Sequence, residues 1–403
     1  MFVWGLTYHK LVQEHSTVSI DRVCCRLLVI GALLAMMLGV TSFGLPLVHA
    51  QEFEIEVVKE NVYLPWSLNF APDGRLFFTS RDTGEIHALD VTTGDLVTFT
   101  PRLPARAGGE GGLLGMELDP DFAQTGVLYV CYSTATQYLP VIRALNTTAV
   151  AHAWPATSDL AVNRLSRLVL SGTQLRDEQV LFTMPHGPRH NGCRVLVSPD
   201  ERYLFISMGD AAEDDRAQNL NSLSGKILRI NRDGSIPADN PFPGSPIWTL
   251  GHRNPQGLAF QPDTGWLWST EHGPDTRDEL NIIKKGENYG WPICLGVQPT
   301  CSVANYEPAV REFYSDRTIA ISDLVFYTGS AFAQWQGDIF FVTLKTGRLY
   351  RLEVDGEEVV QEEILVNNTY GRLRDIAVGP DSYIYFSTDA LDKAKILRMK
   401  PVS

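Results

Sequence analysis

The sequence has little of what membrane-spanning or nucleic-acid-binding proteins need. After residue 50 it shows hardly any helical periodicity, and no further apolar run is long enough to cross a bilayer. Positive charge is also scarce, because 34 Lys and Arg stand against 47 Asp and Glu, giving a formal net charge of −13. Nucleic acids and anionic membranes are bound by basic surfaces. The expected partners are therefore small molecules or neutral polymers.

Several catalytic motifs are also missing. We find no nucleophile elbow, phosphate-binding glycine loop, dinucleotide fingerprint or HExxH metal motif. The glycines of GGEGGLLG, Gly108–Gly115, lack the strand-to-helix context that a dinucleotide-binding turn requires. We interpret them as a loop whose backbone approaches a ligand closely.

Residues 1–50 have the features of an export signal. Arg22 and Arg26 precede the apolar run LLVIGALLAMMLGV, and small residues and Val48-His49-Ala50 follow it. The segment before the apolar run is long, so a retained anchor helix is the alternative. We therefore expect a periplasmic or otherwise exported protein, with residues 51–403 forming one domain.

Only four cysteines lie outside this signal, and export would place them in an oxidising compartment. Cys294 and Cys301 bracket a short loop, PICLGVQPTC, whose length favours a local disulfide over a zinc site. Cys131 and Cys193 lie in strand-like contexts. They are either buried thiols or a second pair.

A repeated pattern predicts the fold. A Pro-Asp or Gly-Asp turn, followed by alternating apolar and aromatic residues, occurs six times, starting at Pro72, Pro120, Pro199, Pro262, Gly337 and Pro380. Several copies continue as a second strand, with GEIHALD, GKILRIN, DELNII, GRLYRLEV and AKILRMK as hairpin partners.

About sixty residues per copy fits an all-β, six-bladed β-propeller of four-stranded antiparallel blades around a central channel. The fallback is a pair of β-sandwich domains. Uneven spacing between the copies places insertions in loops, notably at 134–162 and 219–247. Loops on one face of a propeller usually build the binding site.

His190 is the candidate general base. It follows a Gly-Pro turn in MPHGPRHNGCRVLV and precedes a strand, which would set its imidazole at the mouth of a blade. The alternative is a histidine bonded to a loop carbonyl, and His186 is the nearest competitor.

Arg253 and Asn254 also stand at a strand entrance, where they offer a cation and an amide to a carbonyl or carboxylate. The alternative for Arg253 is an ion pair with a neighbouring blade.

Arg372 and Arg374 alternate in GRLRDIAV, so in a strand both would point the same way. Two guanidinium groups on one face repel each other unless an anion lies between them, and we favour an anionic ligand with carboxylates. Lys345 lies at a tight hairpin turn, where most lysines are simply solvated, so by itself it does not indicate a binding site.

The stretch from Glu271 to Tyr289 is rich in hard oxygen ligands. It combines Gly273-Pro274, whose carbonyls would be exposed, with Asp278 and Glu279. Such ligands suit calcium rather than zinc or copper, although acidic turns are common.

Seven segments together carry a resemblance to a known family. They are EGGLLGMELDPDF, HNGCRVLVSPDERYLFISMGD, SGKILRINRDGSIPADNPF, LGHRNPQGLAF, STEHGPDTRDELNIIKKGENYGWP, LKTGRLYRL and RLRDIAVGPD. In this order they resemble the soluble glucose/sorbosone dehydrogenases that depend on pyrroloquinoline quinone (PQQ), including periplasmic aldose sugar dehydrogenases. The resemblance spans nearly the whole chain after residue 50 and implies a six-bladed propeller that binds PQQ and Ca²⁺.

The resemblance also implies roles for individual residues. His190 matches the catalytic base at the head of an HxxGR-like motif, Arg253 and Asn254 match a quinone-contacting pair, and Lys345, Arg372 and Arg374 match groups around the carboxylates and carbonyls of the cofactor. The carbonyls of Gly273 and Pro274 would hold the calcium that touches the quinone. Glu279 and Tyr289 resemble ligands of a further, structural calcium.

The implied reaction oxidises the anomeric hydroxyl of an aldose to a lactone. His190 would remove the proton while hydride passes to PQQ, with calcium and Arg253 stabilising the developing charge, and an external electron acceptor would reoxidise the cofactor.

The chain departs from the family at three places. Near Ile319 the segment AISDLVFYTG replaces the family's usual PSGLAFYTG, and the other two departures are single residues. Glu110 stands at a cofactor-binding position where relatives often carry Gln, and a carboxylate beside an anionic quinone is unfavourable unless protonated, metal-bound or turned away. Arg189 replaces an acid of the glucose-oxidising branch, which puts glucose in doubt as the substrate.

Two other functions remain open. One is a non-catalytic propeller that binds carbohydrate or protein. The other is a metal-dependent lactonase-like propeller, whose channel would need metal ligands converging from several blades. The sequence leaves the oligomeric state undetermined.

Overall fold

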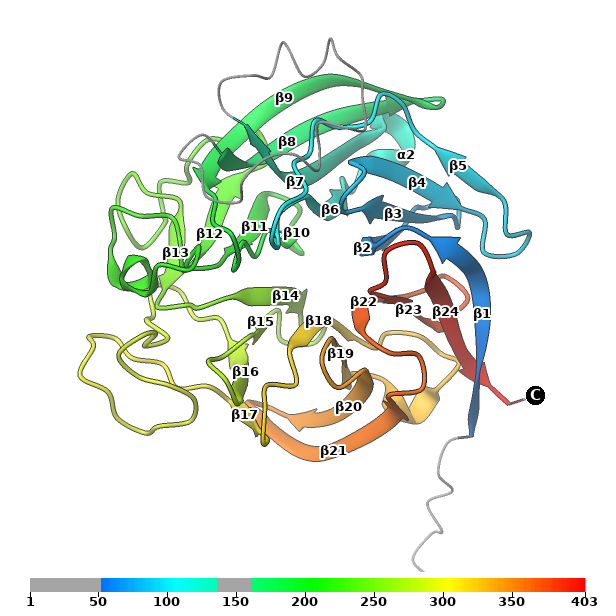
Figure 1. The fold of residues 1–403 in the computed structure, drawn as a ribbon. Coiled ribbons are helices and arrows are strands. Elements are labelled where there is room, and N and C mark those ends of the chain that lie inside the picture. The colour runs from blue at the N-terminus through cyan, green and yellow to red at the C-terminus, as the bar shows by residue number, and fades with distance from the viewer. Residues whose placement is uncertain (1–51, 136–160, 403) are drawn as a thin grey trace, which may run out of the picture. The chain divides into compact units, whose positions relative to one another are not determined.

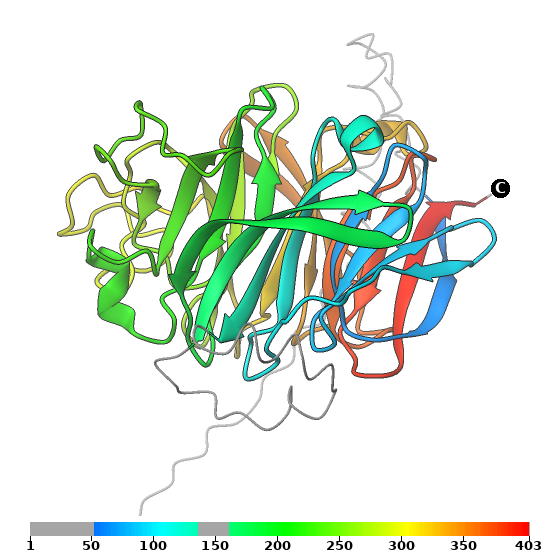
Figure 2. The ribbon, with the colours of Figure 1, turned by 90° about the horizontal axis from the view of Figure 1, so that it is seen from above.

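The computed structural model describes residues 52–135 and 161–402, which form a ring of six four-stranded antiparallel sheets. The predicted six-bladed propeller is confirmed, and the two-sandwich alternative is wrong. Figure 1 views the ring along its axis, and Figure 2 shows the strands running between its two faces. The expected export signal lies outside the described residues, as does most of the expected insertion at 134–162.

Five blades are built from consecutive strands. The blades are β2 (Pro65–Phe70), β3 (Leu76–Ser80), β4 (Glu85–Leu89) and β5 (Leu96–Thr98); β6 (Leu113–Leu118), β7 (Val127–Ala135), β8 (Ala161–Ser171) and β9 (Gln174–Pro185); β10 (Val195–Val197), β11 (Tyr203–Met208), β12 (Lys226–Asn231) and β13 (Ile247–Leu250); β14 (Pro255–Phe260), β15 (Leu267–Glu271), β16 (Arg277–Ile282) and β17 (Arg311–Tyr314); β18 (Ile321–Phe326), β19 (Ile339–Thr343), β20 (Arg348–Asp355) and β21 (Glu358–Asn367). We number these blades 1 to 5.

Blade 6 closes the ring with strands from both ends of the described chain. It contains β22 (Leu373–Val378), β23 (Ile384–Thr388), β24 (Ala394–Pro401) and, outermost, β1 (Phe53–Val62). Strand β1 pairs antiparallel with β24, and Figure 1 shows the two side by side. The sheet hydrogen bonds of this blade therefore hold the ring closed.

The repeated turn motif has one structural place. In each blade it connects the first strand to the second, as Pro72-Asp73 does between β2 and β3. The Asp side chain stabilises the turn by accepting a main-chain N–H two residues later, at Asp73, Asp200 and Asp381 (3.1, 3.2 and 3.1 Å). The predicted hairpin partners form the third strands.

The expected insertion at 219–247 is only partly a loop. Strand β12 lies within it, so the extra length is divided between the segments on either side of this strand. Helix is scarce, as expected. The described residues contain α2 (Phe122–Thr125) and short 3-10 turns at Asp214–Gln218 and Ala333–Trp335, and none of their helices is long and apolar enough to cross a membrane.

The core consists of six apolar clusters, each formed mainly by two neighbouring blades. Strand β11 shows how one strand serves two clusters. Leu204, Ile206 and Met208 pack toward blade 2, whereas Phe205 packs toward blade 4. Successive side chains of a strand point to opposite faces, so a strand buried on both faces is apolar along most of its length, and β11 has one buried polar side chain, that of Ser207.

Arg194 joins five blades at the central channel. It precedes β10 of blade 3, and its guanidinium contacts Asp375 Oδ1 (2.5 Å), Asp323 Oδ1 (3.2 Å), the Gln256 carbonyl (3.1 Å) and Ser67 Oγ (3.4 Å). These four residues belong to blades 6, 5, 4 and 1. The side chain of Arg194 is 7% exposed and those of both aspartates are no more than 8% exposed, so the charges are desolvated and depend on one another.

Candidate functional site

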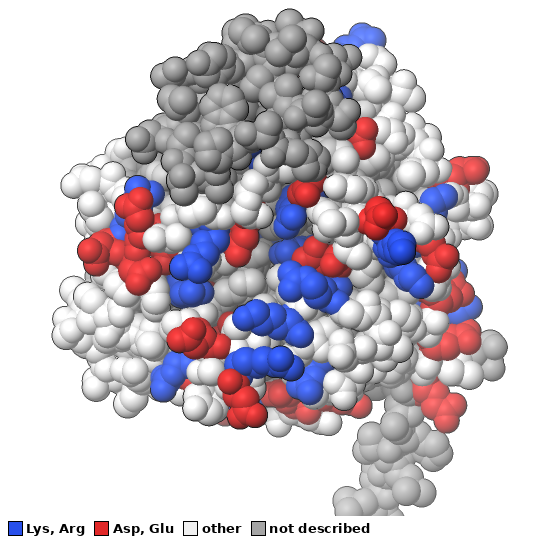
Figure 3. All heavy atoms as spheres, viewed as in Figure 1, with Lys and Arg blue, Asp and Glu red and all other residues white. Residues whose placement is uncertain are grey.

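A cavity of about 610 Å³ lies where the blades converge, and every blade contributes to its lining. The lining residues stand before the first strands of the blades, at the second residue of a first strand, or after the second strands. They are Trp66, Arg81, Glu110, Leu114, Arg189, His190, Asn191, Gly192, Arg253, Gln256, His272, Gly273, Asp275, Thr276, Asp316, Arg317, Thr318, Ala320, Leu344, Lys345, Arg372 and Arg374. Seven are Lys or Arg and three are Asp or Glu. In Figure 3, Lys and Arg side chains gather around the middle of the ring.

The structure places His190 in this cavity, in the loop between β9 and β10. Its Nδ1 lies 2.7 Å from Oδ1 of Asp210. A carboxylate only accepts hydrogen bonds, so Nδ1 carries a proton, and in the neutral form of the ring Nε2 has a free lone pair. The imidazole therefore has the tautomer that a general base requires.

Asp210 is a candidate site residue that the sequence analysis missed. It is fully buried and follows β11, and its second oxygen accepts a hydrogen bond from Trp291 Nε1 (2.9 Å). Its main-chain N–H donates to the Arg253 carbonyl (2.8 Å). These contacts fix the carboxylate against the histidine. The only sequence signal was an Asp at the end of a repeat, twenty positions from His190, and such spacing does not predict contact.

Glu110 lies beside the base loop, which we define as residues 186–193. Its Oε2 accepts the main-chain N–H of His190 (2.7 Å), and its own N–H donates to the Pro188 carbonyl (3.0 Å). The carboxylate therefore binds the backbone of His190. The neighbouring Gly109 also approaches protein closely, because a Cβ there would lie 1.9 Å from the Pro188 oxygen. Our interpretation of that loop as a ligand contact was wrong for Gly109.

Arg253 lines the cavity, but Asn254 does not. The guanidinium of Arg253 donates to the carbonyls of His272 (3.2 Å) and Gly273 (2.9 Å) and lies over the Trp291 ring (5.3 Å). Asn254 is fully buried and its Nδ2 lies 3.4 Å from His272 Nδ1. Asn254 therefore supports the wall through His272. Burial lowers the pKa of His272 to about 3, and the positive charge of Arg374 is the next largest cause of this shift. The ring is therefore neutral.

Lys345 of blade 5 and Arg372 and Arg374 of the neighbouring blade 6 line the cavity, and we call them the cationic wall. Lys345 occupies the expected turn, between β19 and β20. Both arginines bind Oδ2 of Asp389, at 3.0 and 2.8 Å. Although burial alone would raise it, Arg374 and Arg372 hold the pKa of Asp389 well below its ordinary value. A protein carboxylate, which the sequence analysis did not identify, therefore lies between the two arginines. All three cations still face the cavity.

The carbonyls expected to bind calcium are engaged within the protein. Gly273 lines the cavity, and its oxygen accepts from Arg253. The Pro274 oxygen accepts main-chain N–H groups from Thr276 (2.5 Å) and Arg277 (3.1 Å). Within residues 52–135 and 161–402, no three His, Cys, Asp or Glu side chains are arranged to hold a metal ion. The oxygen donors suit calcium in type but are too few, because calcium takes six to eight ligands.

Glu279 and Tyr289 lie outside the cavity lining. Glu279 accepts hydrogen bonds from the Gly296 N–H (2.7 Å) and Asn281 Nδ2 (3.3 Å), and burial and the neighbouring Glu271 raise its pKa to about 8. The Tyr289 hydroxyl donates to the Ile282 carbonyl (2.5 Å) and accepts the Lys284 N–H (2.8 Å). That hydroxyl already donates one hydrogen bond and accepts another, which leaves a single lone pair for a metal ion. The structural calcium stays a prediction.

Comparison with known proteins gives concordant results. The sequence profile of the glucose/sorbosone dehydrogenase family matches residues 62–398. The chain is 33% identical to aldose sugar dehydrogenase YliI of Escherichia coli strain K12 over 364 residues, covering 86% of this chain and 92% of the relative. It is 31% identical to quinoprotein glucose dehydrogenase B of Acinetobacter calcoaceticus over 326 residues, covering 74% and 65%.

Solved structures agree in fold. The apo form of the soluble E. coli aldose sugar dehydrogenase has a TM-score of 0.75 at 31% identity, covering 87% of this chain and all of that one. The PQQ-bound form of aldose sugar dehydrogenase from Streptomyces coelicolor has a TM-score of 0.72 at 29% identity, covering 87% and 99%.

Proposed function

The chain belongs to the glucose/sorbosone dehydrogenase family, and on this premise we propose that it is a PQQ-dependent dehydrogenase that oxidises the anomeric hydroxyl of aldoses to lactones. The observation that carries the proposal is the His190–Asp210 pair in the cavity. A neutral imidazole with a free Nε2 is suited to accept the hydroxyl proton, and a buried carboxylate at Nδ1 stabilises the imidazolium that results.

The lining of the cavity suits a planar tricarboxylate. Lys345, Arg372 and Arg374 supply fixed positive charge, and only two of these three side chains share a protein carboxylate, that of Asp389. We propose that this cationic wall holds the carboxylates of PQQ, with Arg253 near its carbonyls. PQQ, when bound, supplies the hydride acceptor.

The proposed reaction uses few protein groups. His190 Nε2 takes the proton of the anomeric hydroxyl as the C–H bond of the anomeric carbon breaks and its hydride leaves for the cofactor. Asp210 holds the imidazole in place and stabilises its positive charge. The cation of Arg253 stabilises negative charge that develops nearby. The sugar leaves as a lactone, and an external acceptor takes up the two electrons.

Reconstitution tests this function. Apo protein is mixed with PQQ and calcium, PQQ binding is followed by its absorption spectrum, and dye reduction is measured with a panel of aldoses. We expect stoichiometric PQQ binding and dye reduction that depends on both sugar and PQQ. Failure to bind PQQ stoichiometrically would overturn the proposal. Binding without turnover of any aldose would instead favour a non-catalytic propeller.

Calcium and PQQ are expected to bind cooperatively. The protein offers carbonyl oxygens rather than a cluster of acidic side chains, so a calcium ion at Gly273 needs oxygens from the cofactor and from water. Each ligand should therefore raise the affinity of the other by the same factor. We expect PQQ affinity to fall at least about tenfold when EGTA removes calcium.

The control for this prediction is magnesium, which demands a tighter octahedral site and should not restore PQQ affinity. Equal PQQ affinity in calcium and in EGTA would show that no calcium ion shares the cavity. Such a result would leave the role of His190 unaffected, because no step assigned to that side chain uses the metal.

We also propose that the protein is exported. The structure contains two disulfides, Cys294–Cys301, as predicted, and Cys131–Cys193. Disulfides persist in oxidising compartments. N-terminal sequencing of protein from the periplasmic or secreted fraction should give a chain starting near Gln51, whereas a start before Arg22 would support the retained anchor.

A further inference from the structure

The base loop has a backbone that needs outside support. His190, Gly192 and Cys193 have φ values of 59°, 60° and 69°, so three of four consecutive residues are left-handed. Side chains with a Cβ disfavour this region, and His190 and Cys193 both have one. Because the imidazole direction depends on the backbone at residue 190, whatever holds this loop also aims the base.

Blade 2 supplies much of this support. Glu110, on the loop that leads into blade 2, binds the N–H of His190 and the carbonyl of Pro188. Asn163 of β8 donates through Nδ2 to Oδ1 of Asn191 (3.0 Å), and that same oxygen accepts the Gly187 N–H (3.1 Å). The loop thus meets blade 2 near both of its ends.

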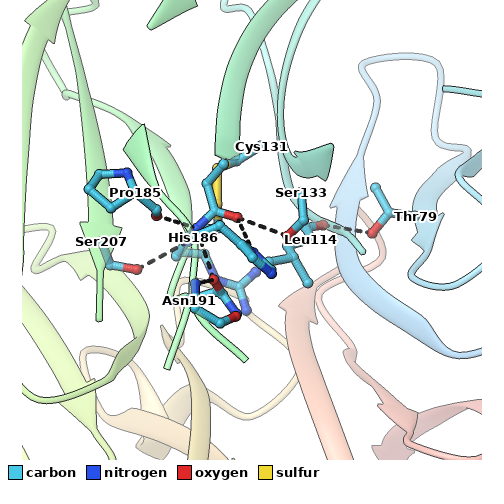
Figure 4. Close-up of a disulfide and its surroundings, with 12 residues drawn as sticks. Thr79, Leu114, Cys131, Ser133, Pro185, His186, Asn191 and Ser207 are labelled. Carbon is cyan, nitrogen blue, oxygen red and sulfur yellow. Dashed lines mark hydrogen bonds between the residues drawn. A yellow bond between two sulfur atoms is a disulfide. The ribbon is translucent and has the colours of Figure 1, made fainter. Parts of the chain in front are cut away.

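The covalent part of this attachment is the disulfide between Cys131 and Cys193. Cys131 lies in the middle of β7, Cys193 ends the base loop, and both are fully buried with Cα atoms 5.6 Å apart. Figure 4 shows this disulfide beside His186, Asn191 and Ser133. Blade 3 completes the support, because the Cys193 N–H donates to the Ser207 carbonyl (2.6 Å) and Asp210 holds the ring of His190.

We propose that the Cys131–Cys193 disulfide is a positioning device for the catalytic base. It ties the base loop to blade 2, while Asp210 orients the imidazole from blade 3, so that Nε2 stays aimed into the cavity. The inference rests on the proposed role of His190. Displacement of a catalytic group by about 1 Å can lower the rate about a hundredfold, so loss of this link should act on turnover.

The test cuts the link without adding backbone strain. Cys131→Ala combined with Cys193→Gly removes the disulfide, and Gly accepts a φ of 69° freely. We expect kcat to fall about ten- to a hundredfold, with KM for the aldose and PQQ affinity within a fewfold of the wild type. In the variant that combines Cys131→Ala with Cys193→Ala, kcat should fall further, because Ala is strained at the left-handed backbone of residue 193.

Hydrogen exchange of the apo protein gives a readout that needs no turnover. In the Cys131→Ala/Cys193→Gly variant, amides of residues 186–193 should exchange faster while the strands of all six blades keep their protection. The matched control is Cys294→Ser with Cys301→Ser. It removes a disulfide between two cysteines that are seven residues apart in sequence and close a short loop. We expect this control to keep wild-type kcat and wild-type exchange in the base loop.

The outcomes separate the two proposals. Wild-type kcat and wild-type exchange in the Cys131→Ala/Cys193→Gly variant would overturn the positioning role. Loss of protection in every blade would also overturn it, since the disulfide would then hold the whole fold. If the wild-type protein oxidises no aldose, the proposed function fails, and hydrogen exchange still decides whether the disulfide holds the base loop.

Discussion

His190→Ala is expected to lower kcat about 10³- to 10⁴-fold while PQQ affinity stays within a fewfold of the wild type. A positioned general base typically contributes about 10²- to 10⁴-fold to a rate. Here the base has a buried carboxylate partner, Asp210. Removal of the His190 imidazole should therefore lower kcat by a factor toward the upper end of that range. PQQ affinity should survive because the cationic wall of Lys345, Arg372 and Arg374 is separate from this pair.

Two further variants make the result specific. Asp210→Asn should lower kcat about a hundredfold, and adding it to His190→Ala should cost little more, because the two side chains act as a unit. Asp233→Asn, the same change at an exposed turn, should leave kcat unchanged. If His186→Ala abolished turnover while His190→Ala preserved it, the assignment of the base would be wrong.

Arg194→Met is expected to lower the free energy of unfolding by about 3–5 kcal/mol, measured by urea unfolding of the apo protein. The substitution leaves Asp323 and Asp375 buried without their counter-ion. Burial already raises the pKa of both carboxyls, and Arg194 opposes that rise. In the variant they therefore hold protons that the unfolded chain releases, so the loss should be smallest at acid pH and grow as pH rises.

The control for this variant is Arg202→Met. Arg202 pairs with Asp200 at 2.7 Å, but both side chains are exposed, and such pairs contribute little. Its unfolding midpoint should match that of the wild type. Equal midpoints for Arg194→Met and the wild type would contradict the view that this arginine holds the blades together at the channel.

The blades could be predicted because their information is local. Each Pro-Asp or Gly-Asp turn joins a first strand to a second. The copy at Pro72 then continues through the second and third strands of its blade, β3 and β4. Closure of the ring could not be predicted in this way. Strand β1 carries no copy of the motif, and its partner β24 lies more than three hundred residues away in the chain.

The site was predictable where single residue types imply a chemistry. His190 and Arg253 are identified as a base and a cation from their residue types, Lys345 only from the family resemblance, and the structure places all three at one cavity. Their partners were not identifiable, because each partner comes from another segment. Asp210 for His190 and Asp389 for the two late arginines stand at strand ends that resemble many others.

Glu110 shows a different limit. The sequence places it near the cofactor, and its charge made that position unfavourable. The structure resolves this conflict by a hydrogen bond to the His190 main chain, which the identity of neither residue could predict. A side chain that binds backbone is hard to anticipate, because every residue offers the same N–H group.

A crystal structure of the protein with PQQ and an aldose or lactone tests the central claim most directly. The account predicts cofactor carboxylates on Lys345, Arg372 and Arg374, and the anomeric carbon of the sugar close to His190 Nε2. A cofactor bound elsewhere, or a sugar whose anomeric carbon lies beyond reach of His190, would contradict the account.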